Sequence, residues 1–282
     1  MKLNKDKAEI FVPDGKPIQE AVARTTHMGI SAHQDDIEIM AFHGVLECFG
    51  KDDKWFMGVV VTNGAGSPRD DLYANYTDEQ MQTVRRLEQK KAAFVGEYSA
   101  QALLDYSSAE VKDSKNQNVV DDLKKIFELA KPEVVYTHNL GDKHDTHVAT
   151  TMHIVRAIRA LPKDARPKKL LGCEVWRDLD WMSDEDKIPL NVEAHENIAS
   201  AVLGVHDSQI CGGKRYDLAT LGRRRAHATY FASHGTDACA LLNFAMDLTP
   251  LIEDDSLDVN EYLKGFISRF QGEVTERVGK FA

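Results

Sequence analysis

Four short, almost continuously apolar runs, separated by helix-like segments, constrain the fold of this chain more than any other feature. The runs are residues 28–32, 55–62, 133–137 and 169–176. Because their apolar residues do not alternate with polar ones, they are typical of parallel strands that helices cover on both faces. The sequence therefore predicts that these segments are strands of one buried, mostly parallel sheet.

Helical patterns fill the intervals between these runs. Thr77 and Gln80 form a capping-box signal at the start of one helix. Apolar residues recur at helical spacing over 119–130, where Pro132 ends the pattern, and again over 145–161. This alternation of strands and helices predicts an α/β fold with an open, mostly parallel sheet and helices on both faces.

The last third of the chain has a different pattern, because after residue 190 the sequence is helical and turn-rich and no longer alternates between strands and helices. Helices are expected near residues 193–204, 216–232 and 259–270. We expect one α/β domain over residues 1–282. Its core spans about residues 25–180, and residues 181–282 form a helical C-terminal extension that packs on this core.

The composition limits which partners and which cellular compartment we expect for this protein. The net charge of -10 over 282 residues argues against nucleic acid or an anionic membrane as the main partner, because both favour a basic surface. No apolar run approaches the roughly 18–20 residues of a membrane span, and the N-terminus lacks the apolar segment of a secretory signal. The scattered cysteines, without a C-x-x-C pair, indicate free thiols in a cytoplasmic protein: Cys48, Cys173, Cys211 and Cys239.

Three polar stretches follow three of the predicted strands. They are His33-Gln34-Asp35-Asp36, the segment TNGAGS at 62–67, and the segment from Thr137 to His147. In open α/β sheets, ligands bind at the carboxyl ends of the strands. The three stretches are therefore expected to meet at one edge of the sheet and to form a site there.

Histidines and acids in two of these stretches have the spacing of metal ligands. His33 and Asp36 are three residues apart at a strand–helix junction, so both side chains can reach one point, and a histidine nitrogen with a carboxylate oxygen suits zinc. Either His144 or His147 could supply a third ligand. Asp35 would then be free to act as a base on a metal-bound water. Alternatively, Asp35 and Asp36 are helix N-cap and first-turn acids.

Several motifs resemble those of one known family. The segment AHQDDIEI at 32–39 resembles the AHPDDxE signature of the LmbE/PIG-L family of zinc-dependent amide deacetylases, with Gln34 in place of proline. The segment HDTH at 144–147 resembles the family's H-P-D-H signature. The Gly-rich TNGAG, the helix RRLEQKKAAFVG at 85–96 and, more loosely, HDSQI at 206–210 also resemble family elements.

The resemblance implies a Rossmann-like fold and a role for each matching residue. His33, Asp36 and His147 match the ligands of a zinc ion, or of another divalent metal. Asp35 matches the general base, and His144 matches the histidine that protonates the leaving amine or steadies the oxyanion.

The second signature departs from the family pattern at Thr146. The family has an aspartate there, which can orient His144 and favour its protonated form. Asp145 or Asp142 could supply the missing carboxylate.

Further residues are candidates for substrate binding. Arg69 and Asp105 match family positions that contact substrate. Arg69 could equally be a surface arginine, and for Asp105 a loop acid is the simpler interpretation. Gln209 could reach the site from the extension. A basic cluster could receive a substrate phosphate or carboxylate, or could be a solvated or subunit-facing surface: Lys214, Arg215, Arg223, Arg224 and Arg225.

The function expected from these residues is a metal-dependent N-deacetylase that acts on an N-acetylated amino sugar or glycoconjugate. One alternative is an amidase on a thiol-sugar conjugate, and another is a non-catalytic metal- or carbohydrate-binding protein. Asp35 argues against the non-catalytic alternative, because binding alone needs no free carboxylate beside the metal. The expected partner is a small molecule, and a homo-oligomer is plausible by family analogy.

Overall fold

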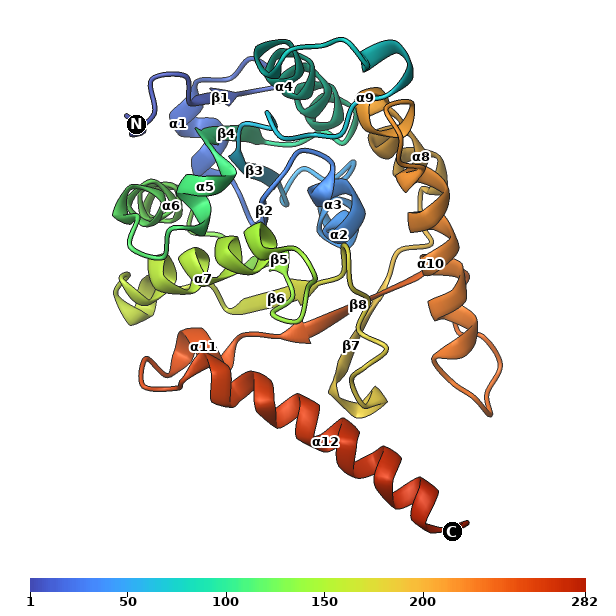
Figure 1. Ribbon diagram of the computed structural model, residues 1–282. Coiled ribbons are helices and arrows are strands. Elements are labelled where there is room, and N and C mark those ends of the chain that lie inside the picture. Colours follow the sequence, from blue (N-terminus) through green and yellow to red (C-terminus); the bar gives the residue numbers. More distant parts are fainter.

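An eight-stranded sheet runs through the computed structural model, which describes residues 1–282 (Figure 1). Its strand order is β1-β4-β3-β2-β5-β6-β8-β7. The strands are β1 (Glu9–Phe11), β2 (His27–Ser31), β3 (Phe56–Thr62), β4 (Ala100–Tyr106), β5 (Val134–His138), β6 (Lys169–Cys173), β7 (Lys187–Asn191) and β8 (Leu242–Asp247).

The centre of the sheet is parallel and its two edges are antiparallel. β4, β3, β2, β5 and β6 run in the same direction, while β1 pairs antiparallel with β4, β8 with β6, and β7 with β8. Every residue of β2, β3 and β4 is buried. The four predicted strands correspond to β2, β3, β5 and β6, so the predicted open, mostly parallel sheet is confirmed.

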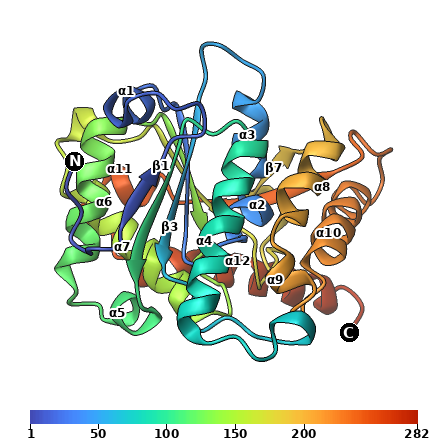
Figure 2. The same cartoon turned by 90° about the horizontal axis from the view of Figure 1, so that it is seen from above.

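Helices cover both faces of the sheet, as Figure 2 shows from above. α1, α6, α7 and α11 pack on one face, and α2, α3, α4 and α8 pack on the other. The helices are α1 (Ile18–Ala23), α2 (Asp36–Met40), α3 (Phe42–Cys48), α4 (Asp78–Val95), α5 (Ser108–Lys112), α6 (Gln117–Ala130), α7 (Asp145–Arg159), α8 (Glu196–Gly204), α9 (Asp207–Ile210), α10 (Tyr216–Tyr230), α11 (Pro250–Glu253) and α12 (Val259–Gly279). The Thr77–Gln80 capping box is present at the start of α4. No helix combines the length and hydropathy that crossing a bilayer requires.

The sequence analysis missed half of the strands. β4 was missed because Gln101 and Asp105 interrupt its apolar run, yet both are buried in the structure. The Gln101 amide donates to the Ala102 carbonyl at 3.0 Å and so satisfies its own polarity inside the core. In the C-terminal segment, β7 comes before the helix predicted near 193–204, and β8 lies between the helices predicted near 216–232 and 259–270. Each of these two strands pairs antiparallel with a neighbour. The helical patterns expected in this segment gave no indication of them.

The chain crosses over at one point of the sheet. It proceeds outward from β2 to β3 and β4 and then returns to place β5 on the other side of β2. The connections that leave β2 and β5 therefore diverge, which opens a crevice at the carboxyl ends of these two strands. The polar stretches after β2 and β5 both lie at this crevice.

A buried arginine locks the C-terminal segment onto the core. Arg224 on α10 is 1% exposed and donates to the backbone carbonyls of Glu38 and Ile39 at 3.0 and 3.1 Å. It also donates to Asn243 on β8 at 3.2 Å. Burial lowers the pKa of Arg224 to about 10, so it stays cationic at neutral pH. The adjacent Arg225 instead pairs with Glu196 at the surface.

Arg224→Met is expected to lower the free energy of unfolding by about 3 kcal/mol, because three buried acceptors lose their donor at once. Denaturant unfolding followed by circular dichroism measures the change. Arg225→Met is the matched control on the same helix, and it should leave the unfolding midpoint almost unchanged because its ion pair is exposed. Equal effects of the two substitutions would contradict the role given to Arg224.

Candidate metal centre

The loop after β2 folds back on itself and presents two of the predicted ligands together. Ser31 donates its hydroxyl to the His33 carbonyl at 2.8 Å, and the His33 amide donates to Asp36 Oδ2 at 2.8 Å. Asp36 is the first residue of α2, so its carboxylate lies at the N-terminus of a helix that continues directly into the core. These bonds fix the His33 and Asp36 side chains on the same side of the loop.

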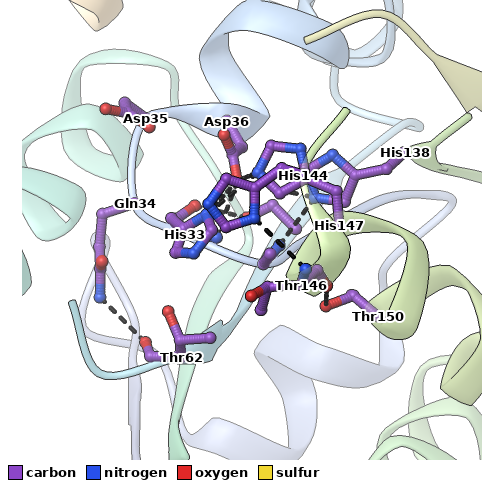
Figure 3. A network of polar contacts seen from close by, with 12 residues as sticks. His33, Gln34, Asp35, Asp36, Thr62, His138, His144, Thr146, His147 and Thr150 are labelled. Atoms are coloured by element: carbon purple, nitrogen blue, oxygen red, sulfur yellow. Dashed lines mark hydrogen bonds and ion pairs between the residues drawn. The ribbon is translucent and has the colours of Figure 1, made fainter. Parts of the chain in front are cut away.

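Three donor atoms converge from the two sides of the crevice (Figure 3). His33 Nδ1 lies 3.2 Å from Asp36 Oδ2 and 3.1 Å from His147 Nε2, and the last two atoms are 3.3 Å apart. Tetrahedral coordination with bonds of about 2.0–2.1 Å requires ligand atoms about 3.3–3.4 Å apart. Two imidazole nitrogens and one carboxylate oxygen in this triangle therefore fit a divalent ion and leave a fourth position open.

Asp142 fixes the orientation of His147 from behind. Its Oδ1 lies 3.4 Å from His147 Nδ1, so the Nε2 lone pair faces the other two donors. The same carboxylate accepts the backbone amides of His144 at 2.9 Å and of Trp176 at 3.0 Å. A carboxylate that holds a ligating histidine by its remote nitrogen is a frequent device of metal sites. The sequence suggests Asp142 only as a partner for His144, because an acid five residues before a histidine gives no clear signal for this contact.

The charges of the triangle are complementary. Burial raises the pKa of Asp36, but the imidazoles of His147, His138 and His33 outweigh it and hold that pKa well below its usual range. Burial lowers the pKa of His147, whereas Asp36 and Asp142 reverse this effect and raise it. The site thus favours a positive charge among these groups. A metal cation can supply that charge in place of the protons.

His138, the last residue of β5, is a site residue that the sequence analysis left without a role. It is fully buried, and its Nε2 lies 3.6 Å from Asp36 Oδ2, within reach of the same centre. This nitrogen already accepts the backbone amide of Ala32 at 2.8 Å. Its ring stacks on that of His147 with the centroids 3.9 Å apart. His138 therefore holds the end of β2 and the His147 ring in place. In the sequence, the only sign of this role is that His138 is a polar residue at the end of a buried strand.

Asp35 occupies a strained backbone position beside the triangle. Its φ is 84° and its ψ is -31°, values that residues with a side chain rarely adopt. It is the N-cap residue of α2, but its side chain makes no capping hydrogen bond, so the simple N-cap interpretation does not describe it. Its carboxylate instead lies 3.3 Å from Arg85 Nη1. Burial raises the pKa of Asp35, and the charge of Arg85 partly offsets this.

His144 stands at the N-terminus of α7 with one nitrogen already engaged. Its Nδ1 accepts the backbone amide of Thr146 at 3.3 Å, so the neutral ring carries its proton on Nε2. Burial, together with the neighbouring His33 and His147, lowers the pKa of His144. Asp145 is exposed and makes no side-chain hydrogen bond, so neither it nor the Thr146 hydroxyl bonds to the His144 ring.

One cavity of about 320 Å³ collects most of the predicted site residues. Its lining includes His33, Asp35, Asp36, His144 and Gln209, together with residues that were not predicted, chiefly Arg85, Trp176 and Tyr216. Arg85 is the first residue of the segment RRLEQKKAAFVG, which resembles a family element. Nothing in the sequence pointed to the two aromatic residues.

Two predicted substrate-binding residues lie outside the lining of this cavity. Arg69 donates to the carbonyls of Ala65 and Tyr76 in its own loop and pairs with Asp78, the first residue of α4. Asp105 pairs with Arg86 at 2.6 Å. Either residue would have to exchange these partners before it could contact a substrate.

Buried acids bring the C-terminal segment to the cavity. Glu38, the acid of the first motif, lies 3.1 Å from His206 Nε2, and Glu88 on α4 accepts the amide and hydroxyl of Ser208, both at 2.7 Å. These contacts fix α9, and Gln209 next to Ser208 thereby lines the cavity. Both acids serve to assemble the site.

Comparison with known families gives one match. The family model PIG-L, described as GlcNAc-PI de-N-acetylase, matches residues 28–158, a range that contains the whole donor triangle. No curated protein matches the sequence.

Several solved structures share the fold at low sequence identity. A 4-carboxy-2-hydroxymuconate hydratase from Pseudomonas putida is similar with a TM-score of 0.61 at 15% identity, over 79% of this chain and 96% of that one. An N,N'-diacetylchitobiose deacetylase from Pyrococcus horikoshii is similar with a TM-score of 0.61 at 14% identity, over 84% and 88%. A zinc-inhibited form of a teicoplanin deacetylase has a TM-score of 0.58 at 14% identity, over 79% and 97%. Because these proteins catalyse different reactions, the shared fold alone does not assign a chemistry.

The geometry predicts one divalent ion per chain. Asp36→Asn and His147→Ala should abolish stoichiometric binding, because each removes a donor atom of the triangle. Asp142→Asn should weaken affinity about 10–100-fold, the size expected when a histidine loses its orienting carboxylate. Competition with a chromophoric chelator measures these affinities with zinc.

His144→Ala is the control for this experiment and should bind the ion with nearly unchanged affinity. Loss of the ion from His144→Ala, with retention in His147→Ala, would show that the third ligand is assigned to the wrong histidine.

Proposed function

We propose that the protein is a divalent-metal-dependent hydrolase that removes an acetyl group from the nitrogen of an amino sugar or glycoconjugate. The match of residues 28–158 to the PIG-L, LmbE-like family model supports this class of reaction. The observation that carries this proposal is the juxtaposition of His33, Asp35, Asp36 and His144 in the lining of one cavity, with His147 buried directly behind His33 and Asp36. The deacetylases among the structural neighbours support the same class of reaction.

His33, Asp36 and His147 would hold the ion, which when bound polarises an acyl carbonyl and lowers the pKa of a water molecule. The ion is expected to be zinc, but the zinc-inhibited form among the neighbours makes other divalent ions worth testing.

Asp35 is the residue placed to move the proton of the attacking water. Its carboxylate is not one of the three donors and lines the first cavity. It pairs with Arg85 and does not cap α2. It accepts the proton as the water attacks the acyl carbon. The same carboxyl then returns the proton to the nitrogen as the bond between carbon and nitrogen breaks, so the amine leaves neutral, acetate is the second product, and the Asp35 carboxylate is regenerated.

His144 acts as a neutral hydrogen-bond donor in this proposal. Its Nδ1 is occupied by the Thr146 amide, and burial disfavours its charged form, so Nε2–H faces the cavity without a second proton to give. Such a donor stabilises the negative charge that develops on the carbonyl oxygen. Of the two roles that the family resemblance left open, the structure supports this one.

Gln209 is the residue we propose for substrate binding. It is 2% exposed, lines the cavity, and is fixed by the Glu88–Ser208 contact. Its amide can donate to and accept from sugar hydroxyls.

The central experiment incubates the protein, loaded in turn with zinc, cobalt or manganese, with N-acetylglucosamine and its derivatives. Free amine and free acetate are both assayed. Release of the two in equal amounts supports deacetylation. Amine without acetate from a conjugate with a larger acyl group supports the amidase alternative, and no amine from any substrate would leave only a binding function.

Asp35→Asn is predicted to lower kcat about 10²–10⁴-fold, because the water loses its base. The fold and the ion should be retained, since asparagine has the same size and tolerates positive φ better than most residues. Chelator competition and thermal unfolding provide these two controls. An Asn variant that lost its ion would show that Asp35 is a ligand.

His144→Ala is predicted to lower kcat by about 10²-fold or more, as for loss of one oxyanion donor. His144→Gln distinguishes the two possible roles, because a glutamine amide donates a hydrogen bond but does not transfer a proton at neutral pH. Partial recovery of kcat in the Gln variant supports the neutral donor. A Gln variant as inactive as the Ala variant would favour proton transfer by His144.

A further inference from the structure

A second cavity of about 190 Å³ adjoins the first one. The two share Trp176 and Tyr216, whose rings meet edge to face with their centroids 5.8 Å apart and form the partition between them. Three cationic side chains line this second cavity, here called the basic groove: Lys214, Arg215 and Arg223. Its lining contains no acidic residue. In a chain with a net charge of -10, such a surface favours an anionic ligand.

Two of the three cations lack an acidic partner. Lys214 Nζ lies 5.2 Å from the centroid of the Trp176 ring, and Arg223 donates one Nη to the Val175 carbonyl at 2.7 Å. Neither forms an ion pair with any carboxylate of the chain. Arg215 differs because Asp217 neutralises it at 2.8 Å. Lys214 and Arg223 therefore keep their charge available, and Arg223 has further N–H groups to offer.

The first cavity differs from the basic groove in its charge balance. Asp35 and Asp36 line it together with Arg85 and Lys112, so it attracts an anionic group less than the basic groove does. The influence of Asp35 and Asp36 reaches the partition, since burial and these two carboxylates raise the pKa of Tyr216. An acidic substituent would lie beyond Trp176 and Tyr216, while the amide lies at the triangle.

We propose that the basic groove binds a carboxylate or phosphate group of the substrate, so that the protein acts on an acidic conjugate of an N-acetylated amino sugar in preference to the neutral sugar. This rests on the proposed function and names its substrate class. The residues that carry it lie outside the segment 28–158 that matches the family model, so they are features of this chain.

The test compares three substrates that differ in charge: neutral N-acetylglucosamine, N-acetylglucosamine 1-phosphate, and N-acetylmuramic acid, which carries a carboxylate. The wild-type protein should show a lower KM for at least one anionic compound, and the better of the two identifies phosphate or carboxylate as the group bound. The preference should weaken as ionic strength rises.

Lys214→Gln and Arg223→Gln should each reduce the ratio of anionic to neutral affinity about ten-fold, the size of one hydrogen bond to a charged group. The change should appear in KM with little change in kcat, because the group bound does not react. The Lys214 side chain makes no hydrogen bond and only faces the Trp176 ring, so its variant keeps the test valid if Arg223→Gln is unstable. Arg225→Gln, on the same helix but outside the groove, should leave the ratio unchanged.

Calorimetric binding of the products, glucosamine 1-phosphate, muramic acid and glucosamine, to metal-loaded protein separates this proposal from the proposed function. If no N-acetyl compound is hydrolysed but an anionic amine binds in a manner that depends on Lys214 or Arg223, the reaction is wrong and the groove stands. Equal affinity for all three amines would overturn the groove. A preference that instead disappears in Lys112→Gln, at the α5 side of the first cavity, would overturn it as well.

Discussion

The meeting of His147 with His33 and Asp36 is the constraint on which the rest of the site depends. The histidine comes from the helix after β5 and the other two residues from the loop after β2, so the triangle closes only because β2 and β5 are neighbours in the sheet. That pairing follows from the chain's return across the sheet after β4. His138 adds a direct tie between the two strand ends through the Ala32 amide. A shift of one residue in the β2–β5 register would move the donors apart by about one residue rise, roughly 3.3 Å, and the coordination would be lost.

Buried polar groups transmit this geometry to the C-terminal segment. Glu38 and Arg224 both act on α2, the acid through its side chain toward His206 and the arginine through the backbone carbonyls. Glu88 fixes Ser208 on the other side. Such groups are costly to bury unless all are satisfied. Because each contact joins the β2 motif or α4 to a residue beyond 200, the first cavity acquires its wall from a part of the chain that shares no sequence motif with the metal ligands.

The sequence revealed those parts of the structure that local pattern and chemistry determine. The parallel strands β2, β3, β5 and β6 were predictable because their apolar runs are nearly unbroken, and the residues of the triangle came together through motif and topology. β4 was not predictable because Gln101 satisfies its own amide only once the strand is in place. Asp142 and His138 depend on tertiary distances of a few ångströms. The arginine cluster shows the same limit, since three consecutive arginines have three different environments: Arg223 in the groove, Arg224 in the core and Arg225 at the surface.

The Asp142 carboxylate connects the donor triangle with the partition between the two cavities. One oxygen faces His147 and accepts the amide of His144, while the other accepts the amide of Trp176. The partition between the two cavities is thus fixed to the same group that orients a ligand. A single carboxylate therefore holds both a predicted metal ligand and one side of the partition. Substitutions within the groove can change the charge that is recognised without altering the triangle, whereas a substitution at Asp142 disturbs both. Under the proposed function, this separation would let Lys214 and Arg223 select the charge of the substrate while the donor triangle stays the same.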